Sequence, residues 1–266
     1  MEPALVVLLL ALLFAGTHVG LATNDLRARL VGRLGTGGFF GLYTLVASLT
    51  FWALVSYYAA HRFDGAPGLG LGADPVVRAV LFGLIGIGFA LIVAGLAAYP
   101  RMPMALFSQA VPPPYGVTRI TRHPFFAGTA LIGSAHVLLA THLSGAVLMG
   151  ALAVLSIAGA RHQDAKLLRL RGRPYADYLA VTSAVPFAAI LYGRQRLVLG
   201  ELPFRFMALG LGLAVLVRSV HASLFADGGR WIVLAVVGGG AVASLQSWLR
   251  LRRSAARPAE LGRVRG

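Results

Sequence analysis

Long apolar runs dominate this sequence and restrict the folds that it can adopt. A helix that crosses a bilayer needs about 20 mainly apolar residues. The runs that approach this length are Ala4–Ala22, Phe39–Ala60, Val76–Ala98, Phe125–Thr141, Gly145–Ala160, Phe204–Val220 and Trp231–Leu249. Charged residues make up 12% of the chain, roughly half of their share in a soluble domain, and the mean hydropathy is +0.77. The sequence therefore predicts an all-α protein, a polytopic transmembrane helical bundle with six to seven spans.

The basic residues predict the orientation of this bundle. When seven spans are threaded through a membrane, twenty of the 24 Lys and Arg residues fall on one side. The four on the other side are Arg62, Arg78, Arg218 and Arg230. Because cytoplasmic loops collect positive residues, we expect the N-terminus outside and the C-terminus inside, in the cytoplasmic (inner) membrane of a bacterium. The net charge of +15 is spread over short loops between apolar runs, so the expected partner is the lipid bilayer and not a nucleic acid.

The segments between the apolar runs predict how the chain is divided. Asn24–Leu34 has leucines at helical spacing and arginines on the other face, which is typical of a helix in the membrane interface. Gly35–Gly38 should interrupt this helix. The fourth and fifth runs are so close that we expect a tight helical hairpin. We assign residues 1–194 to a membrane domain of five spans with cytoplasmic loops, and residues 195–266 to a C-terminal pair of transmembrane helices with a basic cytoplasmic tail.

Two histidines lie inside the predicted spans, where ionisable residues are costly and tend to be functional. His18 falls in the first span and His136 in the fourth. A single buried histidine can simply be hydrogen-bonded within the core. Two in a chain with few polar core groups favour a ligand role, and imidazole is a common axial ligand of haem iron. We therefore take His18 and His136 as candidate metal ligands.

The segment Thr118–Gly128 carries the densest set of functional side chains. Arg119 and Arg122 can share a face at the start of a helix that Pro124 begins, with His123 beside them. Their donors suit an anionic group such as a haem propionate or a nucleotide carboxylate. The alternative is a positively charged anchor at a helix start. Arg119, Arg122 and His123 are the candidate cofactor-binding residues.

A second polar segment, Gln163–Tyr178, alternates basic residues with leucines before Tyr175 and Tyr178 recur at helical spacing. This pattern favours an amphipathic cytoplasmic helix at the lipid headgroups over a catalytic segment.

In combination, several motifs resemble the NnrU family, which includes the 15-cis-ζ-carotene isomerases. They are Gly16-Thr17-His18, Leu34–Ala47, Arg119–Pro124, Ala135-His136 and Thr182–Ile190, within residues 1 to about 194. The resemblance implies an integral membrane protein with a b-type haem held by His18 and His136. It also implies a role in nitrite and nitric oxide respiration, or the cis–trans isomerisation of a carotenoid-like lipid. Leu155 and Ser156 stand where the isomerases carry an additional histidine, which weakens the transfer of that activity.

The predicted depths of the two histidines differ. His18 lies about 6 Å from the cytoplasmic end of its span and His136 about 18 Å from it, at about 1.5 Å per residue. Three solutions remain open. The first helix tilts or continues past Asn24, the fourth helix starts farther into the cytoplasm, or His18 pairs with His123.

A rival resemblance is to membrane methyltransferases of the isoprenylcysteine and phospholipid type. It rests on Arg122-His123-Pro124 and on Gly172–Tyr178, while Gln163-Asp164 stands where that family has two glutamates. It implies S-adenosylmethionine binding by His123, Asp164, Tyr175 and Tyr178. A third hypothesis is a non-enzymatic assembly factor whose basic loops bind a respiratory reductase.

Overall fold

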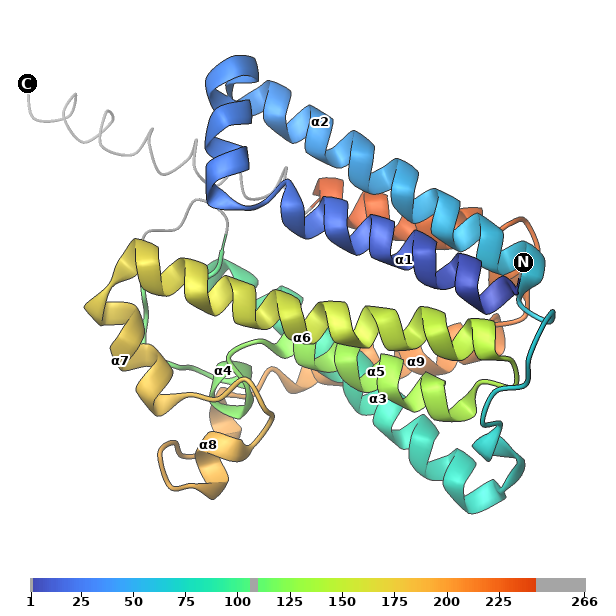
Figure 1. Cartoon of the computed structure of the whole chain (residues 1–266). Coiled ribbons are helices and arrows are strands. Elements are labelled where there is room, and N and C mark those ends of the chain that lie inside the picture. The colour runs from blue at the N-terminus through green and yellow to red at the C-terminus, as the bar shows by residue number, and fades with distance from the viewer. Residues whose placement is uncertain (1, 106–109, 243–266) are drawn as a thin grey trace, which may run out of the picture.

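The computed structural model describes residues 2–105 and 110–242, and its described part is all-helical, as predicted (Figure 1). The long helices are α1 (Pro3–Gly20), α2 (Asn24–His61), α3 (Pro75–Ala98), α5 (Pro124–Leu139), α6 (Leu143–Arg171) and α9 (Phe204–Ser219). The short helices are α4 (Val117–Ile120), α7 (Arg173–Val181) and α8 (Ala188–Leu191), with 3-10 turns at Leu71–Ala73, Tyr99–Arg101, Leu199–Glu201 and Ser223–Phe225. A further apolar helix covers Arg230–Val242.

Among the described residues, four helices are long and apolar enough to cross a membrane by length and composition, which indicates a polytopic membrane protein. They are α1, α2, α3 and α6. The helices Pro124–Leu139 and Arg230–Val242 are apolar but shorter. The last predicted span, Trp231–Leu249, continues past residue 242 and so lies partly outside the described residues. Six to seven spans therefore remain a prediction.

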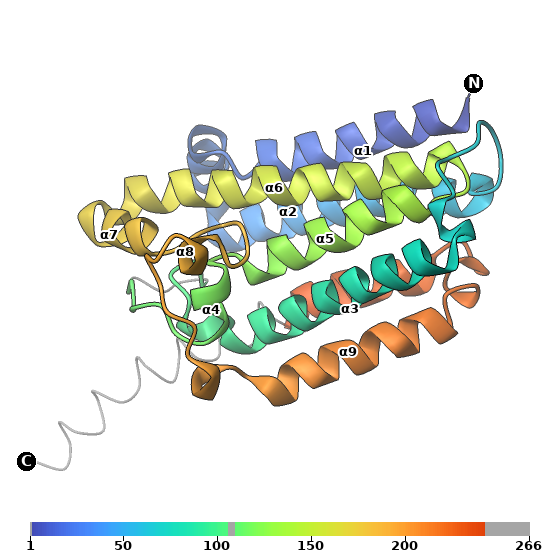
Figure 2. The ribbon, with the colours of Figure 1, turned by 90° about the horizontal axis from the view of Figure 1, so that it is seen from below.

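The long helices pack side by side in the order α2, α1, α6, α5, α3, α9 (Figures 1 and 2). Small residues allow this close approach. A Cβ on Gly210 of α9 would lie 2.6 Å from the Ala90 Cα of α3, and one on Gly133 of α5 would lie 2.6 Å from the Met149 carbonyl oxygen of α6. Close helix contacts thus depend on glycine at these positions.

Helix α2 contains the interruption that its glycines predict. Gly35 has φ 71° and ψ 169°, which is not helical. The segment before it bends away from the rest of α2 (Figure 1). Glycine adopts this backbone without a steric penalty, so the amphipathic first segment is separate from the apolar remainder of α2.

The turn between α5 and α6 marks one end of the bundle. The Gly68 amide donates to the Thr141 carbonyl at 2.9 Å, and the Leu143 amide donates to the Ala66 carbonyl at 2.8 Å. The Ala66 amide in turn donates to Glu2 Oε1 at 3.2 Å. The start of α1 and the end of α5 therefore share this end, which we call the hairpin end. We call the opposite end, where α5 begins and α6 finishes, the Asp164 end.

Helix α6 is longer than the fifth predicted span. It continues without a break through Asp164 to Arg171 and ends at Gly172, which has φ 57°. The predicted span stopped at Ala160 because charged residues follow. In the structure these residues form the last turns of the same helix, beyond its apolar part.

Candidate functional site

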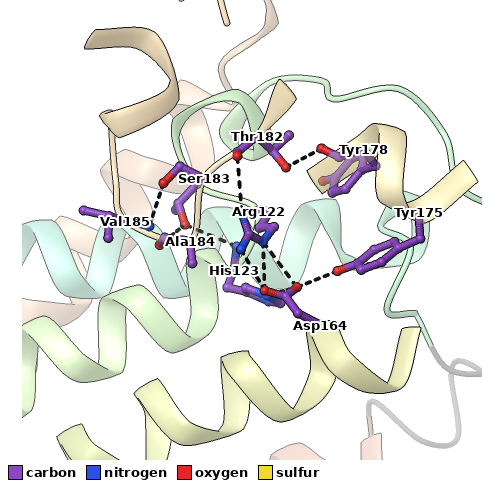
Figure 3. A network of polar contacts seen from close by, with 10 residues as sticks. Arg122, His123, Asp164, Tyr175, Tyr178, Thr182, Ser183, Ala184 and Val185 are labelled. Atoms are coloured by element: carbon purple, nitrogen blue, oxygen red, sulfur yellow. Dashed lines mark hydrogen bonds and ion pairs between the residues drawn. The ribbon is translucent and has the colours of Figure 1, made fainter. Parts of the chain in front are cut away.

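A buried ionic network lies at the Asp164 end (Figure 3). The Asp164 carboxylate accepts from Arg122 Nε at 3.0 Å and from Arg122 Nη2 at 2.8 Å. It also accepts from His123 Nε2 at 2.8 Å and from the Tyr175 hydroxyl at 2.6 Å. An ionised carboxylate can only accept hydrogen bonds, so Nε2 of His123 carries the proton in this contact. The network joins the start of α5 to α6 and α7.

The chain before α5 is held in place by a second segment. The Arg122 amide donates to the Ser183 carbonyl at 2.9 Å, and the Thr121 hydroxyl donates to the Ala184 carbonyl at 2.8 Å. Arg122 Nη1 also donates to the Thr182 carbonyl at 3.3 Å. Because Pro124 has no amide hydrogen, it suits the first turn of α5, and its ring disfavours a helical backbone at His123, which has φ −124° and ψ 61°. The segment after α7 therefore fixes where Arg122 and His123 lie.

The charged side chains of the network are largely shielded from water, and their ion pairs and hydrogen bonds compensate for the lost hydration. Arg122 and Asp164 are each 15% exposed, and His123 is 1% exposed. Both Asp164 oxygens already have protein donors, so the carboxylate has no open side for a further ligand. Burial, and then the hydrogen bond to Asp164, raise the pKa of Tyr175. Its hydroxyl therefore remains a neutral donor at physiological pH.

The His123 ring has one unsatisfied nitrogen. Its Nδ1 is buried and has no hydrogen-bond partner among the described residues, while the ring packs 5.8 Å from that of Phe126. Buried polar atoms are rarely left unpaired, and exceptions are often functional. An imidazole that donates one N–H to a carboxylate and has the other nitrogen free is oriented for ligation or for proton transfer.

Arg119 does not join this network. It forms a two-point ion pair with Glu201, at 2.7 Å from Nε and 2.9 Å from Nη2, and Arg119 Nη1 donates to the Gln195 side chain at 2.6 Å. The Gly116 amide also donates to Glu201, at 2.9 Å. These contacts, led by the Arg119 hydrogen bonds, lower the pKa of Glu201. Arg119 and Arg122 therefore each have a carboxylate partner within the chain. Neither guanidinium group has a pair of donors left for the predicted haem propionate.

The two predicted haem ligands have separate surroundings. His18 lies in α1, where the Tyr43 hydroxyl is 3.1 Å from Nε2 and the Phe14 ring is 5.3 Å away. His136 lies in α5, where its Nδ1 donates to the Ile132 carbonyl at 2.9 Å and its ring centroid lies 6.2 Å from that of His221.

These two histidines lie at opposite ends of the bundle. His18 is fifteen residues after the start of α1 at the hairpin end, which places it about 22 Å along the helix from that end. His136 is three residues before the last residue of α5, which places it about 5 Å from the same end. Two axial ligands must both reach one iron. His18 and His136 therefore do not fit as a pair on a single haem, and tilt or extension of one helix does not remove a difference of this size.

The local sequence motifs contain the residues of the network but not the partners of Arg119. Arg122, His123, Asp164 and Tyr175 were all singled out by motif. Glu201 and Gln195 were not, although an acidic residue in a strongly basic region is a signal that an arginine has a nearby partner. Nothing in the local pattern indicates which arginine that is.

Comparisons with known proteins support the resemblance. The family model described as NnrU protein matches residues 6–227. The chain is 29% identical over 201 residues to 15-cis-zeta-carotene isomerase, chloroplastic, of Arabidopsis thaliana, covering 73% of this chain and 52% of that protein. It is 28% identical over 199 residues to the protein of the same name from Zea mays, covering 72% and 52%. The chain thus spans about half the length of these curated relatives, and no solved structure matches it. By its match over most of its length, the chain belongs to the NnrU protein family.

Proposed function

We propose that this protein is a membrane-embedded cis–trans isomerase of a carotenoid-like polyene. The observation that carries the proposal is the similarity to two proteins named as 15-cis-zeta-carotene isomerases, over nearly three quarters of this chain. A long apolar polyene partitions into the bilayer, where apolar helices such as α3 and α6 can reach it. Isomerisation changes only the torsion about one double bond, so substrate and product contain the same atoms and electrons.

Within this proposal, His123 is the functional residue of the Asp164 end. Asp164 holds the proton on Nε2 and fixes the ring orientation, which leaves Nδ1 as the free nitrogen. Arg122 keeps the carboxylate ionised and in place. Asp164, Arg122 and Tyr175 are therefore positioning residues. Haem b remains a proposed cofactor from the resemblance, and no step here runs through it, because His18 and His136 do not fit one iron.

The proposal includes the topology expected from the basic residues. It places the N-terminus outside, the C-terminus inside and six to seven spans in the inner membrane of a bacterium. The Asp164 end, which holds Arg119 and Arg122, then faces the cytoplasm. The alternative to the isomerase is a role in nitrite and nitric oxide respiration, with a respiratory reductase as partner.

The activity can be tested with purified protein in liposomes that contain 15-cis-ζ-carotene, kept in the dark. Chromatographic separation of the isomers should show loss of the 15-cis form with time. Parallel arms with and without added haem b measure whether the cofactor is required. His123→Gln should slow the conversion, whereas Arg169→Gln, an exposed substitution in α6, should not. No conversion by well-folded protein in either arm would contradict the proposal.

A methyltransferase is the second candidate, because the structure gathers three of its four expected residues into one network. His123 and Tyr175 both contact Asp164, while Tyr178 stacks on Tyr175 at 5.7 Å between ring centroids. However, Asp164 has no acceptor site left for a cofactor. Calorimetry with S-adenosylmethionine in nanodiscs tests this candidate, and saturable binding that is lost in Asp164→Asn would favour it. An assembly factor would instead co-purify with a reductase and would not need His123.

A further inference from the structure

A cavity of about 570 Å³ lies at the Asp164 end, apart from the buried network. The end of α3, residues 100–103 and 112–116 after it, α4 and the start of α9 surround it, with Ala97, Ala98, Met102, Val117 and Phe206 among its lining residues. Its size is in the range of small-molecule sites, about 300–1,000 Å³. Most of the wall is apolar, so an ion alone would leave much of this surface without a complementary partner.

Two arginines give the cavity a positive charge. Arg101, just after α3, and Arg205, in the first turn of α9, both line it and are both exposed. Neither forms an ion pair within the described part of the chain. Arg205 lies over the Phe206 ring, 4.8 Å from its centroid. Both guanidinium groups therefore lie at the cavity with donors that suit an anion.

The acidic residue of the wall does not cancel this charge. Glu201 lines the cavity, but its carboxylate is held by Arg119 and by the Gly116 amide. This ion pair is internally neutral, so Arg101 and Arg205 remain as net positive charge.

Tyr178 adds a polar group to the wall. Its side chain lines the cavity and is 4% exposed, and its hydroxyl lies close to the Thr118 side chain, which also lines the cavity. Burial raises its pKa to about 12, so the group is a neutral hydrogen-bond donor at physiological pH.

We propose that this cavity binds the phosphate headgroup of an anionic glycerophospholipid, with the first acyl carbons against the apolar wall. The position supports a lipid over free phosphate, because the cavity lies where the apolar helix α3 ends and α9 begins. Basic pockets at the ends of transmembrane helices commonly bind anionic headgroups. The proposal does not depend on the isomerase activity.

The test is native mass spectrometry of the full chain extracted from membranes and offered equal amounts of phosphatidylglycerol and phosphatidylcholine in detergent. The wild type should retain phosphatidylglycerol in preference. The exposed pair Arg101→Gln and Arg205→Gln together should reduce this retention roughly tenfold or more. The matched control Arg169→Gln with Arg196→Gln removes the same charge from exposed positions outside the cavity, and should retain the lipid.

A steric variant separates the cavity from surface charge. Ala97→Phe narrows the cavity without changing its charge and should also reduce lipid retention. Equal retention by the wild type and by the Arg101 and Arg205 variant would overturn the proposal. So would equal loss in the control pair, which would indicate general surface attraction. Displacement of the lipid by millimolar inorganic phosphate would show that the site takes free phosphate instead.

Discussion

His123 Nε2 lies 2.8 Å from Asp164 Oδ1, and this contact ties the start of α5 to the last third of α6. Since Asp164 also accepts from Arg122 and Tyr175, a single carboxylate connects the start of α5, the end of α6 and α7. The stability of the Asp164 end and the orientation of the His123 ring both depend on it.

Asp164→Ala should therefore destabilise the protein strongly. Removing one partner of a buried ion pair leaves an uncompensated charge, at a cost of roughly 3–5 kcal/mol. The measurement is the Tm of the purified protein in detergent. Asp177→Ala is the matched control, because the Asp177 pair with Arg173 is largely exposed and contributes about 1 kcal/mol or less. Equal Tm values for the two variants would contradict the buried network.

Gly128→Ala should weaken the packing of α5 on α3. A Cβ at this position would meet the Gly88 carbonyl oxygen and the Ile92 side chain, and overpacking typically costs roughly 1–3 kcal/mol. Gly83→Ala is the control in α3, where a Cβ meets nothing within 4 Å. That substitution should leave the Tm unchanged or raise it slightly, because alanine favours the helix. A drop in Tm for Gly83→Ala alone would show that the two helices pack differently.

The chain contains no cysteine, so single introduced cysteines can report its topology directly. Asp64→Cys lies at the hairpin end and Arg196→Cys in the loop after α8, at the other end. With the N-terminus outside, a membrane-impermeant maleimide should label position 64 in intact cells. Position 196 should react only after the membrane is permeabilised. The reverse labelling pattern would overturn the proposed orientation.

The separation of His18 and His136 predicts how a haem spectrum would respond to substitution. If purified protein binds haem b, at most one of His18→Ala and His136→Ala should change the Soret band. His61→Ala, a histidine paired with Asp64 at the exposed hairpin end, serves as the control. An equal shift of the band in both variants would show that the two side chains reach one iron, contrary to the arrangement of α1 and α5.

The elements that could be predicted well are those whose bounds depend on neighbouring residues in the sequence. Apolar runs gave the helices, the short gap before α6 gave the hairpin, and Gly35 gave the break in α2. Helix α6 was predicted too short, because Arg161 and Asp164 looked like the end of a span. In the structure Asp164 is paired with Arg122, His123 and Tyr175, and α6 continues past it to Arg171.

The parts that could not be predicted depend on which distant segments meet. Arg119 and Glu201 are 82 residues apart, and His123 and Asp164 are 41 apart. Periodicity does not encode such pairs. The spacing of His18 and His136 is a similar case, since motif similarity places both residues in helices but does not give the distance between them.

The most direct test of the proposed function is the conversion of 15-cis-ζ-carotene by the purified protein in liposomes, followed in the dark by isomer-resolving chromatography. The 15-cis form should decline with wild-type protein, and His123→Gln should slow this decline while Arg169→Gln should not. Conversion that is equally fast in His123→Gln would contradict the role of the Asp164 end. An unchanged isomer ratio with folded wild-type protein, with and without added haem b, would contradict the isomerase itself.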